Sequence, residues 1–306
     1  MRRLLRALDA CALICLFVFG ARLAHAEPIR SEAEALQARI EQAARAVDGD
    51  PRLKTMSHEQ RRALVQFVAG NMFFVLLHEM GHVHITEMGL PVLGREEDAA
   101  DTFATVTLLR IGSAVTHRML VEAAKGWFLS ARRDQQEGIT FAFYDEHGLD
   151  SQRAYWIVCL MVGSDPERFN DLAEETGLPE NRRQTCAGDY SNASWSWDQV
   201  LAPHRRTPDK PRTTISVVYG PDKDERQAFE RSFRFLRLLE TVAEHASEKW
   251  IWRAPFTLEV QSCGEPGSHW NLPTRTLTLC YEMAADFAQL YRNYASDPAV
   301  PPFKFR

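Results

Sequence analysis

The pattern of apolar and polar positions along the chain predicts a mainly helical protein. Apolar residues recur at the three- to four-residue spacing of a buried helix face in most of the long segments. The predicted helices cover residues 31–47, 57–88, 95–111, 115–133, 151–162, 225–247 and 281–291. The helix at 57–88 has a plausible N-cap in Ser57, with Gln60 three residues later, and the Gly89-Leu90-Pro91 turn ends it. Its apolar run is interrupted by Gln66, Gly70 and Asn71, which favours a buried core helix over a membrane span.

Short segments with strand character lie in the C-terminal part of the chain. They occur at residues 214–219, 256–261 and 276–279. Between residues 188 and 227 the composition shifts to Pro, Ser, Thr, Asp and Trp, and Trp195 and Trp197 alternate as in a strand. We therefore expect an α+β fold, mainly helical, with a helical lobe at 27–190 and a smaller C-terminal α+β lobe at 191–306 with a hairpin region, both in one catalytic unit.

The first 26 residues have the organisation of an export signal. Three arginines lie among the first six residues, residues 11–20 are apolar, and Ala24-His25-Ala26 has small residues at the positions that determine cleavage. We expect a signal peptide at 1–26 and a periplasmic or extracellular protein with no stable membrane span. An uncleaved anchor is the alternative, although the apolar run is short for a bilayer and Arg22 ends it.

Export changes the charge and the cysteine count. Loss of residues 1–26 removes four Arg and one Asp, so the net charge changes from −5 to −8, which argues against nucleic acid as a partner. Four cysteines remain, an even number in a compartment where disulfides persist. Pairing of neighbours along the chain predicts Cys159–Cys186 and Cys263–Cys280, although four cysteines allow three connectivities.

The central motif is His78-Glu79-Met80-Gly81-His82, at the end of the apolar helix. Side chains four residues apart lie one above the other on a helix, so both imidazoles can bind one metal ion. Glu79 is rotated by about 100° from His78, which suits a general base that contacts a water molecule instead of the metal. The motif predicts a zinc site with His78 and His82 as ligands and Glu79 as a catalytic residue.

A catalytic zinc ion usually has three protein ligands. The start of the next predicted helix offers carboxylates, and we expect Glu97 to be the third ligand, with Asp98 as the alternative. Asp101, one turn after Glu97, is expected to accept the second N–H of a ligand imidazole. Glu96 is expected to be solvated, because helix N-termini attract acidic residues for dipole reasons alone.

The motif and the following helix resemble known metallopeptidases. His78 to His82 followed by Glu97-Asp98-Ala99-Ala100-Asp101 is similar to the gluzincins, in which a helix-borne glutamate before Ala-Asp supplies the third ligand. The segment 90–101, with Gly163-Ser164-Asp165-Pro166 and Leu279-Cys280-Tyr281-Glu282, more closely resembles a bacterial family of metallopeptidases without known function. The resemblance implies zincin-like metal-binding helices and a peptide or protein substrate.

The sequence differs from these metallopeptidase relatives in two respects. In such relatives the segment from Cys-Gly to Cys-Tyr-Glu precedes the metal-binding helix and contains Asn-Ala, like the substrate-binding edge strand of thermolysin-like enzymes. Here that segment follows the helix, and Gly267-Ser268 occupies the Asn-Ala position. The position of the substrate-binding strand therefore stays open, although a Cys263–Cys280 disulfide would brace a hairpin beside the cleft.

Two residues are candidates for stabilising a tetrahedral intermediate. Zinc peptidases commonly use a distant His or Tyr as this hydrogen-bond donor, and His147 and Tyr281 are the candidates here. The predicted function is hydrolysis of peptide bonds by a metal-activated water, with Zn²⁺ as cofactor and Glu79 as the general base. The alternative is an exported, non-catalytic binding or scaffold protein of zincin-like fold that is stabilised by a metal.

Overall fold

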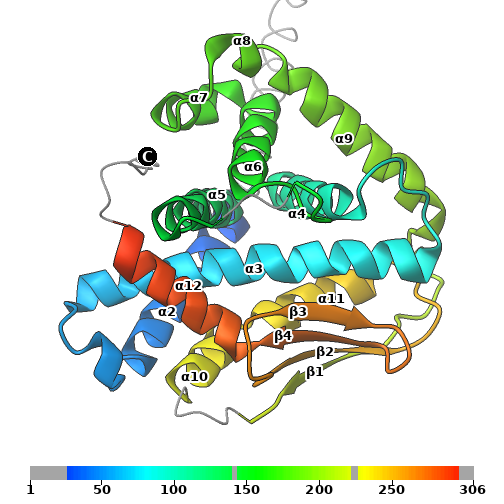
Figure 1. The fold of residues 1–306 in the computed structure, drawn as a ribbon. Coiled ribbons are helices and arrows are strands. Elements are labelled where there is room, and N and C mark those ends of the chain that lie inside the picture. Colours follow the sequence, from blue (N-terminus) through cyan, green and yellow to red (C-terminus); the bar gives the residue numbers. More distant parts are fainter. Residues whose placement is uncertain (1–25, 140–142, 222–226, 296–306) are drawn as a thin grey trace, which may run out of the picture.

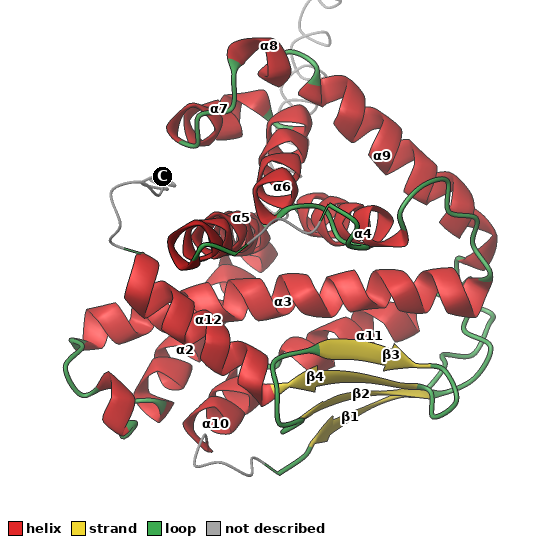
Figure 2. Cartoon of the chain, viewed as in Figure 1, coloured by secondary structure: helices red, strands yellow, loops and turns green. Residues whose placement is uncertain are grey.

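Helices make up most of the protein, and the strands gather beneath one long helix (Figure 2). The structure, a computed structural model, describes residues 26–139, 143–221 and 227–295. The predicted α+β, mainly helical class is confirmed. The helices are α2 (Ala26–Ala46), α3 (His58–Met88), α4 (Glu96–Ile111), α5 (Ala114–Glu137), α6 (Asp150–Ser164), α7 (Pro166–Glu175), α8 (Glu180–Arg183), α9 (Cys186–Leu201), α10 (Gln227–Leu236), α11 (Leu238–Lys249) and α12 (Tyr281–Tyr294). Short 3₁₀ turns lie at Pro51–Leu53 and Ala202–His204, and the strands are β1 (Ile215–Tyr219), β2 (Phe256–Gln261), β3 (Ser268–Asn271) and β4 (Thr276–Cys280).

Helix α3 is the central element, with α4, α5 and α6 on one side and the sheet on the other (Figure 1). Its 31 residues begin at the predicted capping box of Ser57 and Gln60 and end at Gly89, whose φ of 63° stops the helix. Among the described residues, only α3 has the length and apolar content of a membrane span, and 89% of its most apolar stretch is buried inside the protein. Helix α3 is therefore a core helix, as predicted.

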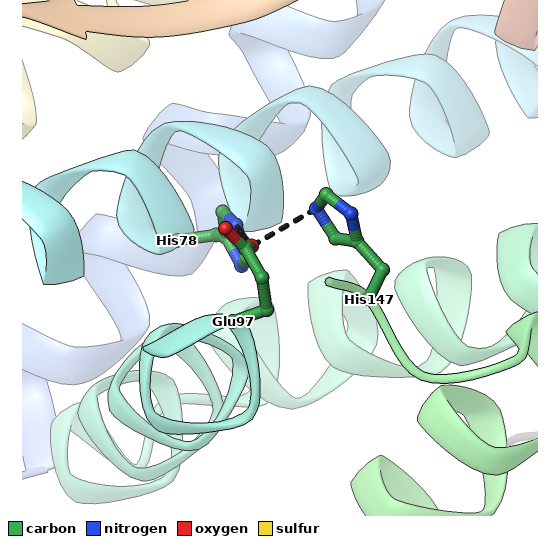
Figure 3. A group of neighbouring side chains, drawn as sticks. All are labelled: His78, Glu97 and His147. Atoms are coloured by element: carbon green, nitrogen blue, oxygen red, sulfur yellow. Dashed lines mark ion pairs between the residues drawn. The ribbon is translucent and has the colours of Figure 1, made fainter. Parts of the chain in front are cut away.

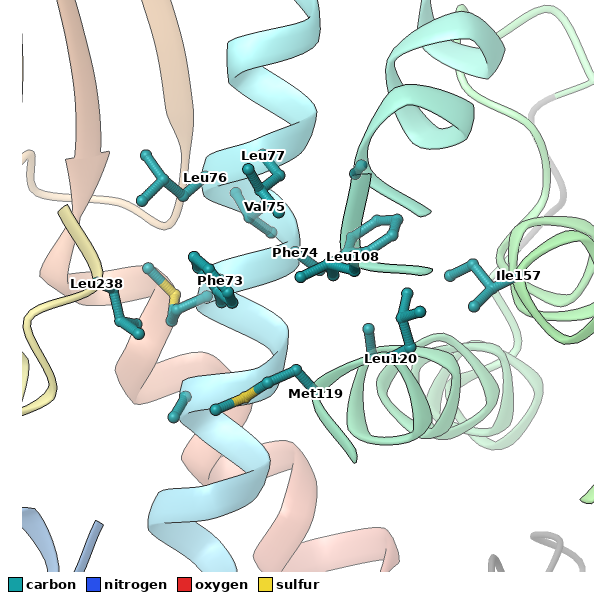
Figure 4. Close-up of a cluster of buried hydrophobic side chains, with 14 of the residues drawn as sticks. Phe73, Phe74, Val75, Leu76, Leu77, Leu108, Met119, Leu120, Ile157 and Leu238 are labelled. Carbon is teal, nitrogen blue, oxygen red and sulfur yellow. The ribbon is translucent and has the colours of Figure 1, made fainter. Parts of the chain in front are cut away.

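The core between α3 and its neighbours is built from fully interdigitated aliphatic and aromatic side chains (Figure 4). Phe74 of α3, Leu108 of α4, Leu120 of α5 and Ile157 of α6 are each buried to 1% exposure or less. These contacts hold α3 and α4 in register, and α4 supplies the acidic residues that follow the histidine motif.

A close contact between α3 and α4 depends on a glycine inside the histidine motif. A Cβ atom at Gly81 would lie 2.9 Å from the Cα of Ala100. Only the absence of a side chain at Gly81 and the small one at Ala100 allow this approach. The contact brings the first turn of α4 against the histidines.

The sheet has the order β1-β2-β4-β3, with β3 at the edge that faces α3. β1, β2 and β4 are parallel, and β3 is antiparallel to β4, with Ser268 opposite Leu279. Cys280 N–H donates to the carbonyl of Gly267, and because pairing alternates along an antiparallel ladder, the backbone groups of Ser268 and Trp270 point to the free edge. Strand β3 was not predicted, because Trp270 is the single apolar residue among its four and gives no apolar alternation.

Several helices also differ from the sequence predictions. Residues 186–201 form helix α9, so the interpretation of Trp195 and Trp197 as strand residues is wrong, and the predicted lobe boundary at 190 lies inside this helix. The single helix predicted at 225–247 is two helices, α10 and α11, separated at Arg237 with a φ of 55°. Helix α7 was not predicted; its N-cap is Asp165, which accepts from the N–H of Arg168.

Both disulfides join the cysteines that neighbour each other in sequence. Cys159 of α6 is bonded to Cys186 at the start of α9, and Cys263 is bonded to Cys280 at the end of β4. The predicted pairing is therefore present, and it is compatible with an exported protein. The predicted signal peptide lies outside the described residues, except for Ala26, which is the first residue of α2.

Candidate metal centre

His78 and His82 project from α3 one turn apart and turn their ring nitrogens toward each other. The Nε2 atoms are 3.2 Å apart. Each Nδ1 has its own carboxylate partner, because Asp101 Oδ1 lies 2.8 Å from Nδ1 of His78 and Glu96 Oε1 lies 2.8 Å from Nδ1 of His82. The Glu96 side chain is 47% exposed, in line with the expectation that it is solvated, and its carboxylate also contacts an imidazole, which was not expected.

Glu97 comes from the first turn of α4 and points at both imidazoles. Its Oε2 atom lies 3.0 Å from Nε2 of His78 and 3.4 Å from Nε2 of His82. Asp98, the alternative ligand, instead forms a half-exposed ion pair with Arg95 at 2.9 Å. Of these two carboxylates, the structure therefore brings Glu97 to the histidines and leaves Asp98 at the surface.

The chemistry of these groups fits a cation between them. A carboxylate accepts hydrogen bonds, so each Nδ1 carries a proton, and the two facing Nε2 atoms are the nitrogens that can bind a metal when they lose theirs. Two nitrogens bound to one tetrahedral zinc ion at about 2.0–2.1 Å lie about 3.3 Å apart, close to the 3.2 Å found here. Glu97 Oε2 is buried and has no hydrogen-bond partner of acceptable geometry among the described residues, although imidazole nitrogens surround it. Two imidazoles and a carboxylate suit a first-row divalent metal.

The acidic surroundings of the imidazoles shift their pKa values upward. Burial lowers the pKa of His82, but the interactions with the carboxylates of Glu97 and Glu96 outweigh it and raise the pKa to about 9. Burial opposes ionisation of Glu97, yet contacts with His147, His78 and His82 hold its pKa far below the usual range. The carboxylates around the imidazoles therefore favour a positive charge at this position.

Glu79 lies beside this cluster and is held by a residue from the sheet. Its carboxylate is 7% exposed, and Ser268 Oγ donates a hydrogen bond of 2.6 Å to its Oε1 atom. Ser268 is on β3, 189 positions away in sequence. The edge strand therefore contacts the proposed general base directly.

The comparison with family models agrees with this geometry. The model of DUF4344, described as "Putative metallopeptidase", matches residues 37–201, more than half of the chain. The chain belongs to this metallopeptidase family. No curated protein and no solved structure matched the chain significantly. The matched range contains His78, Glu79, His82 and Glu97, whereas β3 with Ser268 lies outside it.

A largely buried arginine supports one of the two clustered histidines of this metallopeptidase-family chain. Arg153 of α6 contacts both oxygens of Asp101, at 2.7 Å each, and its guanidinium stacks on Trp127 at 3.7 Å from the ring centroid. Burial opposes ionisation of Asp101, but the charge of Arg153 and the contact with His78 lower its pKa. The contact between Asp101 and a histidine was predicted, but the contact between Arg153 and Asp101 was missed, because α6 meets α4 only in the folded protein.

His147 comes from the segment between α5 and α6 and faces the same carboxylate (Figure 3). Its Nε2 atom lies 2.9 Å from Oε2 of Glu97, and its Nδ1 lies 3.2 Å from Oδ1 of Asp145. The contact with Glu97 raises the pKa of His147. About half of the His147 side chain is exposed, so this imidazole lies at the open side of the cluster.

Tyr281 is placed elsewhere. Its side chain is fully buried, and its hydroxyl donates to the carbonyl of Gly220 at 3.3 Å. It packs against Phe233.

A second group of possible ligand atoms lies at Cys263, Cys280 and Glu282, which are close to one another, but both cysteine sulfurs are in the disulfide. Glu282 accepts hydrogen bonds from the N–H groups of Cys263 and Gly264.

Proposed function

We propose that this chain is a zinc-dependent, gluzincin-like metallopeptidase that hydrolyses peptide bonds, with His78, His82 and Glu97 as ligands. The observation that supports it best is the convergence of two imidazole nitrogens and a buried carboxylate oxygen within 3.4 Å of one another. Family membership supports peptidase chemistry and a metal cofactor. The donor set is the one that zinc prefers in catalytic sites.

When bound, zinc would polarise a substrate carbonyl and acidify a water molecule. The chain supplies the remaining functions. Glu79 accepts the proton of the attacking water and transfers it to the leaving amine, and Ser268 holds the Glu79 carboxylate in one orientation. His147, protonated beside Glu97, donates a hydrogen bond to the oxyanion that develops on the carbonyl.

The substrate backbone would lie along β3. The outward groups of Ser268 and Trp270 offer main-chain hydrogen bonds to an extended peptide at the edge of the sheet. Strand β3 contacts α3, and Ser268 reaches Glu79, so a peptide paired there would pass beside the general base. Main-chain pairing of this kind selects extended peptides and is insensitive to most side chains.

The test is a comparison of Glu79→Gln with His82→Ala. We expect Glu79→Gln to retain one zinc ion per chain while cleavage of a peptide library falls by at least about 10²-fold, since a positioned base contributes about that factor or more. His82→Ala should lose zinc. Glu59→Gln, an exposed carboxylate in the first turn of the same helix, is the matched control. Undiminished cleavage by Glu79→Gln would contradict the assigned base.

A non-catalytic role is the second candidate, and the position of His147 favours it. His78, Glu97 and His147 present ligand atoms that all lie within 4.8 Å of one another. Together with His82 they could give four protein ligands, and such a closed site is structural. The variant His147→Ala separates the two functions. A transition-state donor predicts normal zinc affinity with slower cleavage, whereas a fourth ligand predicts weaker zinc binding and a lower melting temperature.

A further inference from the structure

A cavity of about 530 Å³ lies on a different face of α3 from the metal ligands, none of which lines it. Its floor is formed by Phe73, Leu77, Met80 and His84 at positions i, i+4, i+7 and i+11 of one helix face. Eleven residues of helix extend about 16 Å, so the cavity is long as well as large. Its volume lies in the range of about 300–1,000 Å³ that small-molecule sites occupy.

The walls of this cavity are apolar and come from several helices. Phe73 and Leu238 lie on the same side of α3, and Met119 borders the same region (Figure 4). Trp197 of α9 and Trp250, directly after α11, add aromatic surface. The shape and lining suit a flexible aliphatic chain that lies along α3.

The rim carries excess positive charge. Arg110, His245 and Lys249 line the cavity. Asp198 is the acidic partner of both Arg110, at 2.6 Å, and Arg205, at 2.7 Å. Within the described residues, Lys249 has no carboxylate at ion-pairing distance; burial, and after it the charges of Arg205 and Arg110, lower its pKa. One carboxylate therefore serves two guanidinium groups. The ammonium group of Lys249 lies 5.2 Å from the centroid of the Trp250 ring and has no carboxylate of its own among the described residues.

One polar atom in the floor also lacks a partner. His84 is 1% exposed and lies among Phe103, Trp250 and Trp252, and its Nδ1 bonds to the carbonyl of Met80 at 2.6 Å. Nδ1 is therefore the protonated nitrogen, and Nε2 is a buried acceptor without a donor among the described residues. An ionised carboxylate has no donor for this atom, so a water molecule would have to satisfy it.

We propose that this cavity binds a long-chain aliphatic carboxylate, with the chain along Phe73, Leu77 and Met80 and the carboxylate at Lys249. The apolar floor requires an apolar body, and the ammonium group, which has no carboxylate of its own among the described residues, requires an anionic head group. A cationic or neutral amphiphile of equal length would fill the same volume without satisfying Lys249.

The experiment uses delipidated, purified protein and three probes with the same alkyl chain: dodecanoate, dodecanol and dodecyltrimethylammonium. Isothermal titration should show one dodecanoate per chain, bound at least about tenfold more tightly than the cationic probe, because a charge-assisted hydrogen bond contributes about 1.5–3 kcal/mol. Lys249→Gln should weaken dodecanoate about tenfold and leave dodecanol unchanged. Lys54→Gln, an exposed lysine elsewhere, should change neither.

A second variant tests the volume. Val242→Trp inserts a larger side chain into the cavity wall and should abolish binding of both dodecanoate and dodecanol. If melting shows that this variant is unfolded, Thr107→Trp fills the same cavity from α4. Equal affinity for all three probes, unchanged dodecanoate binding in Lys249→Gln, or retained binding in a folded cavity-filled variant would each overturn the proposal.

Discussion

At the scale of single residues, the site is organised by hydrogen bonds that orient reactive groups. Asp101 and Glu96 each hold the Nδ1 of one histidine, and Ser268 holds one oxygen of Glu79. Fixed ring orientations direct both Nε2 atoms to the same point. A freely rotating imidazole or carboxylate would lose part of this preorganisation.

Ser268→Ala should lower kcat/KM for peptide cleavage about tenfold and leave zinc content unchanged. The reason is the loss of a hydrogen bond to a charged group, which contributes about 1.5–3 kcal/mol. Steady-state kinetics and metal analysis measure the two effects separately. Ser216→Ala, an exposed serine of β1, is the control, and an unaltered rate in Ser268→Ala would argue against positioning of Glu79 by β3.

At the scale of elements, the separation of α3 and α4 sets the distance between the histidines and Glu97. Gly81 and Ala100 allow the two helices to touch, and Glu97 lies one turn before Ala100. Interfaces of packed helices resist added volume, so a methyl group at this contact must displace one helix.

Gly81→Ala should weaken zinc binding and lower the free energy of unfolding of the metal-free protein by about 1–3 kcal/mol. The added Cβ would lie 2.9 Å from the Cα of Ala100 and push Glu97 away from the imidazoles. Competition with a chelator and urea unfolding measure these changes. Gly188→Ala is the matched control, since nothing lies within 4 Å of a Cβ there; equal zinc affinity in both variants would contradict the argument.

The contact of α3 with α5 contains a carboxylate whose ionisation opposes folding. Burial raises the pKa of Glu122, even though Gln66 donates a hydrogen bond to it at 2.6 Å. Because the pKa of Glu122 is higher in the folded state, the folded protein binds more protons than the unfolded chain. The free energy of unfolding therefore falls as the pH rises above 4.5, the pKa of this group in the unfolded chain. Glu122→Gln should therefore be more stable than the wild type at pH 7, and urea unfolding should show the difference shrinking as the pH approaches 4.5. A difference independent of pH would contradict this.

At the scale of the whole molecule, the two disulfides join elements on opposite sides of α3. Cys159–Cys186 ties α6 to α9, whereas Cys263–Cys280 ties the segment after β2 to the end of β4. The first spans 27 positions and the second spans 17. Cross-links over such loops mainly restrict the unfolded chain.

Cys159→Ala with Cys186→Ala should lower the free energy of unfolding by about 3.5 kcal/mol, as loop-closure entropy predicts. The matched pair Cys263→Ala with Cys280→Ala should cost about 3 kcal/mol. Because β3 lies within the loop that the second disulfide closes, loss of this disulfide should also slow peptide cleavage, whereas loss of the first should affect stability alone. Denaturant unfolding and kinetics distinguish these outcomes, and an equal loss of cleavage at matched stability would contradict the distinction.

The sequence by itself determined most helices, the fold class, the disulfide pairing and the spacing of His78 and His82. These features depend on local periodicity, capping and proximity along the chain, which are properties of neighbouring residues. The predictions for residues 186–201 and 225–247 were wrong. Composition alone cannot show that the polar residues of 186–201 face solvent on a helix, or that the second helix is interrupted at Arg237.

Only the tertiary structure showed that Glu97 faces the histidines and Asp98 does not, that Glu96 contacts His82, and that Arg153 and Ser268 lie at the site. Neighbouring acidic residues in one helical turn have equal local propensities, so the helix contact at Gly81 selects which of them faces the histidines. Arg153 and Ser268 lie 52 and 189 positions from their partners, and contacts over such distances exist only after the elements have packed.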